Sequence, residues 1–190
     1  MQKVRQAIAY TVAALLIAVG ALAFAPGIGV AHPEEALAKS MKVTSAGIKD
    51  GKIAKKYGYN HGNTSIPLKV KNIPKKAKYL AIYMRDLDVD WDHWLAANLS
   101  KGKSKATSKK IVAGASNKWA SKMVQGITGV GIEKYEGPHP PVTHTYAITV
   151  YALKSKVDLS AGFTYSQFKK AIKGKVVKKC TIKGKYTYTS

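Results

Sequence analysis

Two short stretches decide the fold of this chain: DLDVDWDHW at residues 86–94 and YEGPHPPVTHTY at residues 135–146. Each stretch brings together carboxyl, imidazole or phenol groups. In the second stretch Gly137 tolerates unusual φ angles, and three prolines hold φ at about −65° and push the residues before them toward extended backbone. A rigid loop that leads into a strand suits positioned side chains, so we expect the two stretches to meet at one pocket.

Several other segments have the apolar patterns of β-strands. Residues 78–85 are apolar enough to be buried on both faces, and residues 145–153 are apolar enough for a central strand. Residues 176–182 and 186–188 are expected to pair around Gly184 at the end of the chain. Because strands outnumber helices, the pattern predicts a mainly β protein, a β-sandwich with peripheral helices.

One helix has a clear start near the C-terminus. Thr164 and Gln167 have the spacing of a capping box, and Phe163 and Phe168 have that of a hydrophobic staple. Gly174 is a natural stop, because helices commonly end at a glycine in the left-handed conformation. The sequence therefore predicts a C-terminal helix that begins after Thr164.

Three further motifs follow the order found in a known family. They are SAGIKDG at residues 45–51, NTSIPL at residues 63–68 and GKY at residues 184–186. With the two stretches above, they resemble the phosphatidylethanolamine-binding protein (PEBP) family, in its bacterial Raf kinase inhibitor-like branch, over roughly residues 42–188. The resemblance implies a PEBP-like antiparallel β-sandwich, with a large sheet, a smaller sheet and a C-terminal helix near the pocket.

The resemblance also implies a ligand pocket. Carried over residue by residue, its candidate members are Asp86, His93, Gly137, Pro138, His144 and Tyr146, with Asp88, Tyr135 and His139 as further candidates. In the family such a pocket binds small anions and phosphorylated head groups. The residue types suit that task, because an imidazolium and a phenol donate hydrogen bonds to phosphate oxygens. Asp86 can orient an imidazole or accept from an ammonium, so a zwitterion such as phosphoethanolamine would use both kinds of group.

The chain departs from the family pattern at three places. The family's Asp-Pro-Asp-x-Pro is DLDVD at residues 86–90, which removes both prolines and some of the loop's rigidity. Thr145 stands where the family usually has an arginine, and Lys175 stands where a histidine often follows the glycine that ends the helix. We expect these changes to affect ligand preference more than the fold.

A binding module for a small anionic or phosphorylated ligand is the function that these residues favour. An inhibitor or regulator of an exported protease or other protein is one alternative, suggested by eukaryotic relatives. A phosphoester hydrolase is another, because two histidines and an aspartate could form a metal site or an acid–base set. The chain has no Gly-x-Ser-x-Gly or His-Glu-x-x-His motif, and its single cysteine, Cys180, lies in an unrelated strand. We therefore favour a protein without catalytic residues, metal ion or cofactor.

The net charge of +22 comes from 32 Lys and Arg against 10 Asp and Glu. Residues 1–38 are neutral overall, so the whole excess lies in residues 39–190, where Arg85 is the only arginine. Sequence-specific reading of nucleic acid relies on arginine's planar fork, whereas lysines supply a diffuse positive field. The lysines are therefore expected to form a solvated surface, or to contact an anionic cell-wall polymer or a membrane surface. The sequence is also compatible with a homodimer.

Residues 1–38 have the order of a secretory signal peptide. Two basic residues precede an apolar run at residues 12–25. Segments with small residues, of the kind found before a cleavage site, follow at residues 29–31 and 36–38. Cleavage is expected after Ala31 or after Ala38.

Removal of the leader would leave a single PEBP-like domain, residues 39–190, secreted or held at the cell surface. The alternative is an uncleaved N-terminal anchor, because residues 12–30 are just long enough to span a bilayer.

Overall fold

The computed structural model describes residues 40–188 with the exception of residue 104. The expected leader, residues 1–38, lies outside the described residues together with its cleavage points. Among the described residues, no helix has both the length and the apolar character needed to cross a membrane.

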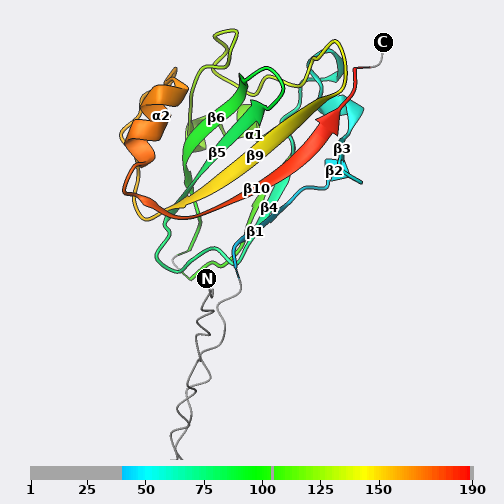
Figure 1. Cartoon of the computed structure of the whole chain (residues 1–190). Coiled ribbons are helices and arrows are strands. Elements are labelled where there is room, and N and C mark those ends of the chain that lie inside the picture. The colour runs from blue at the N-terminus through cyan, green and yellow to red at the C-terminus, as the bar shows by residue number, and fades with distance from the viewer. Residues whose placement is uncertain (1–39, 104, 189–190) are drawn as a thin grey trace, which may run out of the picture. The chain divides into compact units, whose positions relative to one another are not determined.

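The large sheet has seven strands in the order β2-β3-β10-β9-β5-β6-β8. Their bounds are Ile48–Lys49 (β2), Lys52–Ile53 (β3), Tyr79–Asp86 (β5), Trp91–Ser100 (β6), Val124–Gln125 (β8), His144–Leu153 (β9) and Val176–Tyr186 (β10). Neighbouring strands are antiparallel, except that β3 and β10 are parallel. Strand β9 lies at the centre, between β10 and β5, as its sequence predicts (Figure 1).

The small sheet has three antiparallel strands in the order β1-β4-β7. They are Lys42–Thr44 (β1), Leu68–Lys71 (β4) and Lys109–Ile111 (β7). Leu68 and Val70 of β4 are buried in one hydrophobic cluster with side chains of the large sheet, whereas Lys69 and Lys71 are exposed. The predicted β-sandwich with a large and a smaller sheet is therefore confirmed.

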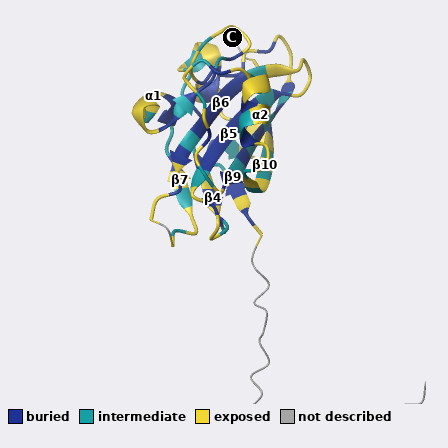
Figure 2. Cartoon of the chain, turned by 90° about the vertical axis from the view of Figure 1, so that its left-hand side faces the viewer, coloured by how far each residue is buried: buried dark blue, intermediate teal, exposed yellow. Residues whose placement is uncertain are grey.

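Strand β5 is buried on both faces, as predicted. Leu80 and Ile82 belong to the cluster shared with the small sheet, whereas Tyr83 belongs to a second cluster that includes Phe168 of the C-terminal helix. Figure 2 shows the central strands as mostly buried. Each large apolar side chain contributes roughly 1.5–3 kcal/mol when fully buried, so β5 is a firm support for the residue at its end, Asp86.

Short helices surround the sheets. They are α1 (Ala115–Lys118), α2 (Tyr165–Ile172) and the 3-10 helices η1 (Lys55–Tyr57), η2 (Tyr59–His61) and η3 (Ala120–Lys122). Helix α2 begins as predicted, because Thr164 and Gln167 make both hydrogen bonds of the capping box. Phe163 stacks on Phe168 with ring centroids 6.0 Å apart, and Gly174 follows the helix with a left-handed φ of 72°. Helix α2 lies on the side of β6 (Figure 1) and contributes no residue to the cavity described below.

The end of the chain differs from the expectation of two strands around Gly184. One continuous strand, β10, pairs with β9 along its length, and Gly184 lies within it, opposite Tyr146. A Cβ atom at Gly184 would lie 2.8 Å from Cγ1 of Ile53. The glycine therefore permits the close approach of β3 and makes no turn.

Candidate functional site

Three strand ends bring the two sequence stretches together. Strand β5 ends at Asp86, β6 begins at Trp91 and β9 begins at His144. In the sheet Asp86 lies opposite Trp91 on one side and opposite Tyr146 on the other. The turn between β5 and β6 and the loop that precedes β9 therefore lie at the same end of the large sheet.

A cavity of about 380 Å³ opens at this end of the sheet. Its polar lining residues are Asp86, His93, Glu136, His139, His144 and Tyr146. Its apolar lining residues are Val89, Trp91, Val130, Pro140 and Pro141. All the polar lining residues except Glu136 are candidates from the sequence, so the structure brings five of the nine candidate pocket residues together.

Asp86 is the centre of a hydrogen-bond network in the cavity wall. It is buried, and its Oδ2 lies 2.7 Å from Nδ1 of His144. Its Oδ1 accepts the backbone N–H of Asp88 at 2.8 Å, and the hydroxyl of Tyr146 donates to the same carboxyl group. Burial opposes ionisation of Asp86, but these hydrogen bonds outweigh it and hold the pKa of Asp86 below its ordinary value. The side chain is therefore a carboxylate at neutral pH.

The network fixes the orientation of His144 and Tyr146. Because a carboxylate only accepts, Nδ1–H of His144 points at Asp86, and Nε2 is the nitrogen left for a ligand. Burial, together with the hydrogen bond to Asp86, raises the pKa of Tyr146. The phenol therefore keeps its proton and donates a hydrogen bond to Asp86, so toward a ligand its oxygen acts as an acceptor.

His93 is a buried member of the cavity wall. Its Nδ1 lies 2.9 Å from the carbonyl oxygen of Glu136, which can only accept, so Nδ1 carries a proton and Nε2 is the acceptor of the neutral ring. Burial lowers the pKa of His93, although the nearby Glu136 and Asp86 act in the opposite direction. The ring is therefore neutral near pH 7. The imidazolium donor expected for an anion is not His93.

Gly137 and Pro138 hold the loop in place and do not line the cavity. The N–H of Gly137 donates to Oδ1 of Asn63 at 2.7 Å, and the carbonyl of Pro138 accepts the N–H of Tyr59 at 3.0 Å. A Cβ atom at Gly137 would lie 2.4 Å from the carbonyl oxygen of Tyr57. Glycine is thus required where the loop meets helices η1 and η2.

Asp88 and Tyr135 also act outside the cavity lining. The Oδ2 of Asp88 accepts the backbone N–H of Thr145 at 2.6 Å, which ties the turn after β5 to the start of β9. Tyr135 is buried, its hydroxyl donates to the carbonyl of Tyr57 at 2.9 Å, and its ring meets Trp94 edge-on. Both residues therefore position their neighbours and do not face a ligand.

Sequence reasoning misses Glu136 and Trp91. The Nε1 of Trp91 donates to Oε1 of Glu136 at 3.1 Å, and the N–H of Glu136 donates to the carbonyl of His93 at 2.8 Å. One signal could have found Glu136. In extended backbone successive side chains point to opposite sides, so a Tyr135 that packs into the core directs Glu136 the other way.

Asp86, Asp88 and His144 offer atoms of metal-ligand type within 4.8 Å of one another. These side chains already have hydrogen-bond partners, since His144 donates to Asp86 and Asp88 accepts from Thr145. Among the described residues that line the cavity there is no serine, threonine or cysteine. The lining offers imidazole, carboxyl and phenol groups that can form hydrogen bonds with a ligand.

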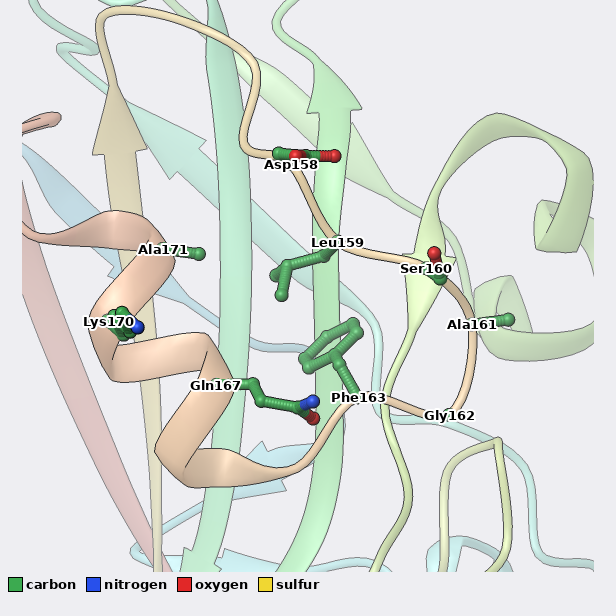
Figure 3. Close-up of a pocket in the computed structure, with 9 residues that line it drawn as sticks. All are labelled: Asp158, Leu159, Ser160, Ala161, Gly162, Phe163, Gln167, Lys170 and Ala171. Carbon is green, nitrogen blue, oxygen red and sulfur yellow. The ribbon is translucent and has the colours of Figure 1, made fainter.

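A larger cavity, of about 460 Å³, lies between α2 and the preceding residues 158–163 (Figure 3). The side chains of Leu159 and Phe163 lie between the backbone of that segment and α2, and Gln167 and Lys170 project from the helix. The side-chain oxygen of Gln167 accepts the backbone N–H of Thr164 at 2.7 Å, as part of the capping box of α2. No residue of the two sequence stretches lines this cavity, so its size alone does not make it the functional site.

Comparison with known proteins gives one consistent result. A family model described as phosphatidylethanolamine-binding protein matches residues 43–187. A UPF0098 protein from Chlamydia muridarum is 32% identical over 157 residues, which cover 77% of this chain and 98% of the relative. A UPF0098 protein from Methanothermobacter thermautotrophicus is 30% identical over 140 residues, which cover 72% of this chain and 91% of that protein.

Solved structures of the same architecture cover the described residues. The PEBP homolog CT736 from Chlamydia trachomatis superposes with a TM-score of 0.68 and 28% identity, over 79% of this chain and 99% of that one. Escherichia coli YbcL, a member of the mammalian PEBP family, superposes with a TM-score of 0.67, over 78% of this chain and 99% of that one. At 22% identity the second likeness concerns the fold alone.

Proposed function

This chain belongs to the phosphatidylethanolamine-binding protein family, and we propose that it is an exported binding module for a small phosphorylated ligand. The ligand lies in the cavity at the ends of β5 and β9. One observation supports this most: His144 lines the cavity while its Nδ1 is bonded to the buried Asp86. An imidazole held in this way presents Nε2 in a fixed direction.

The proposed contact is made by the imidazolium form of His144, whose Nδ1–H donates to Asp86 while its Nε2–H donates to a phosphate oxygen. The ring keeps its bond to Asp86 when the ligand binds, so little orientation is lost. Trp91, Pro140 and Pro141 supply apolar walls, which exclude water and strengthen the polar contacts inside. The neutral His93 supplies an acceptor for a hydroxyl or amine of the ligand.

Titration calorimetry of the protein with inorganic phosphate and with phosphoethanolamine tests this proposal. A hydrogen bond to a charged group contributes about 1.5–3 kcal/mol, so His144→Ala is expected to lower both affinities about tenfold or more. His61→Ala is the matched control, because His61 stacks near Tyr188 and does not line the cavity. Wild-type affinity of the His144→Ala variant for both compounds would refute the proposal.

Hydrolysis of a phosphoester is a second candidate function, because the His144–Asp86 pair also has the arrangement that orients a general base. If the protein is a hydrolase, ³¹P NMR is expected to show the release of inorganic phosphate from phosphoethanolamine, and the His144→Ala variant is expected to release none. A bound ligand that stays intact supports the binding module.

Export is the part of the proposal that concerns residues 1–38. A basic start, an apolar run and small residues before Ala31 and Ala38 support it. N-terminal sequencing of protein recovered outside the cytoplasm is expected to begin at His32 or Lys39. A cytoplasmic chain that still begins at Met1 or Gln2 would contradict export.

A further inference from the structure

The face of the large sheet that carries α2 is only partly covered by that helix. Tyr151 of β9 meets Phe168 of α2 edge-on, with ring centroids 5.6 Å apart. Further along β9, the alternate residues on the same face are Thr145, Ala147 and Thr149, and they are only half-buried. In Figure 1, β9 and β10 cross the front of the sheet and α2 lies to one side of them. This part of the face is therefore open to solvent.

The open part of the face has a high density of positive charge. Lys179, Lys183 and Lys185 of β10 are exposed, and they lie opposite the β9 residues that belong to this face. The register of the sheet adds Lys52, opposite Lys185, and Lys49, opposite Lys52. Neither β9 nor β10 contains an aspartate or a glutamate. The lysines therefore have no acid on these two strands to neutralise them.

Arg85 lies on the other side of this surface. It is opposite Ala147 of β9, and Ala147 is opposite Lys183 of β10, so two cations flank one small side chain. Neighbouring strands are about 4.8 Å apart, so the backbones that carry the two cations are about 10 Å apart. One nitrogen of Arg85 contacts Asp90, whereas its Nε has no hydrogen-bond partner among the described residues. The guanidinium group therefore has donor capacity left for an anion.

Two hydroxyl groups lie beside the same position. The Oγ1 atoms of Thr149 and Thr181 are 2.8 Å apart, on residues that lie opposite each other in β9 and β10. Because only one of them donates in this bond, the hydrogen of the other is left for an acceptor. Phosphate oxygens accept hydrogen bonds from lysine, arginine and hydroxyl groups. The surface between Arg85 and Lys183 is therefore suited to phosphate groups.

The other side chains of the face narrow the class of partner. Single-stranded nucleic acid binds where its bases stack on aromatic rings, but the aromatic ring that β9 offers on this face, Tyr151, is packed against Phe168. A membrane surface favours exposed apolar side chains. Val142 and Val89, the two most exposed large apolar side chains among the described residues, lie in loops outside this face. A water-soluble polymer without bases fits the surface better than either.

We propose that the open face of the large sheet binds a linear polyol phosphate polymer, which has one phosphate group in each repeat and no aromatic base. The basic face, as we call this surface, consists of Lys49, Lys52, Arg85, Lys179, Lys183 and Lys185. The polymer lies along β10, and one of its phosphate groups lies over Ala147. None of these six cations lines the site cavity, so the inference goes beyond the proposed function and does not depend on it.

Calorimetric titration of the protein with poly(glycerol phosphate) tests the basic face. Lys183→Gln/Lys185→Gln removes two charges and is expected to lower the affinity about tenfold. In a series of salt concentrations, the slope of log affinity against log salt is expected to become less steep by about 1.4, which is about 0.7 for each lost contact with a flexible polyanion.

Lys75→Gln/Lys76→Gln is the matched control. It removes the same charge from the exposed turn before β5, outside the basic face. It is expected to change the affinity less than about twofold, because distant exposed charges are screened. An equal loss of affinity in the two double variants would show attraction by the net charge alone and would overturn the basic face.

Arg85→Lys tests the contact between Arg85 and Lys183. The variant keeps the charge but removes the planar fork of donors, so it is expected to lower the affinity about threefold. Wild-type affinity of this variant would overturn the contact assigned to Arg85.

Three further polyanions test the class of partner. Polyglutamate, single-stranded oligo(dT) and vesicles of phosphatidylglycerol are compared with poly(glycerol phosphate) at equal concentrations of charge, and each is expected to bind more weakly. Equal or tighter binding of polyglutamate, of oligo(dT) or of the vesicles would overturn the polyol phosphate assignment in favour of charge alone, nucleic acid or a membrane, respectively.

Competition separates the basic face from the site cavity. A saturating concentration of phosphoethanolamine is expected to leave the affinity for poly(glycerol phosphate) unchanged. Displacement of the polymer would place it in the cavity and overturn the inference. Failure of the protein to bind phosphoethanolamine, with polymer binding intact, would refute the proposed function and leave the basic face standing.

Discussion

Aspartate side chains hold the turn between β5 and β6, which the family pattern would constrain with two prolines. Asp86 accepts the N–H of Asp88 at 2.8 Å, and Asp88 accepts the N–H of Thr145 at 2.6 Å. Arg85 forms an ion pair with Asp90, whose φ of 60° is left-handed. Asx-type hydrogen bonds favour tight turns, so this turn keeps its shape without proline.

The neutral state of His93 predicts how stability depends on pH. Burial lowers the pKa of His93, so the folded protein favours the neutral ring, whereas the unfolded chain takes up a proton near its ordinary pKa of about 6.5. The stabilisation is therefore complete above about pH 6.5. It is lost as the pH falls from there toward the lowered pKa, by about 1.4 kcal/mol for each pH unit between the two pKa values.

Urea unfolding at pH 7.5 and at pH 5.5 measures this effect. His93→Asn replaces the ring by an amide that can donate to the carbonyl of Glu136 but does not titrate. We expect its free energy of unfolding to fall less between the two pH values than that of the wild-type protein. An equal fall in both proteins would contradict the lowered pKa of His93 in the folded protein.

The sequence predicts the polar centre of the site but not its full lining. Asp86, His144 and Tyr146 are predictable because they lie at the ends of predicted strands and because the motifs that contain them follow the family's order. The sequence indicates Tyr135 as a candidate and does not indicate Glu136, whereas in the structure Tyr135 packs into the core and Glu136 lines the cavity. The direction of a side chain in an irregular loop depends on packing against distant segments, here helix η1, which local sequence does not reveal.

At the level of elements, α2 was predictable because its signals are local. The capping box of Thr164 and Gln167 and the stacked Phe163 and Phe168 lie within a few residues of one another. The continuous strand β10 was not predictable in the same way. Glycine is common in turns, but the role of Gly184 depends on its contact with Ile53, which lies in the β2–β3 hairpin far away in the sequence.

Thr164→Ala tests the independence of α2 from the site. Loss of an N-cap side chain costs about 0.5–2 kcal/mol, so the free energy of unfolding is expected to fall by that amount. Ligand affinity is expected to stay unchanged, because no residue of α2 lines the site cavity. Ser166→Ala, an exposed change in the first turn, is the control for both measurements. A clear loss of affinity in Thr164→Ala would show that α2 supports the site.

At the scale of the whole molecule, lysines face lysines on both sheets. Lys42 lies opposite Lys71, and Lys69 lies opposite Lys110, in the small sheet. In the large sheet Lys52 lies between Lys49 and Lys185. Like charges directly opposite each other are destabilising, so we propose that these surfaces attract an anionic partner.

Salt dependence of cell retention tests that surface. If the lysines bind an anionic cell-wall polymer or membrane surface, retention should fall steeply with salt, because exposed charges are screened over about 10 Å at 0.1 M. Washing the cells at low and at high salt and measuring the released protein gives the answer. Retention that does not change with salt would leave the lysines as a solvated surface only.

The central claim, that the cavity at the ends of β5 and β9 binds a small phosphorylated ligand, is tested most directly by the imidazole ¹⁵N–¹H spectrum of the protein during titration with phosphoethanolamine. The ring signals of His93 and His144 are expected to shift with one binding curve, because both side chains line the cavity. The ring signals of His61, which stacks near Tyr188 outside the cavity, are expected to stay in place. Unchanged signals of His93 and His144 at saturating ligand would contradict the claim.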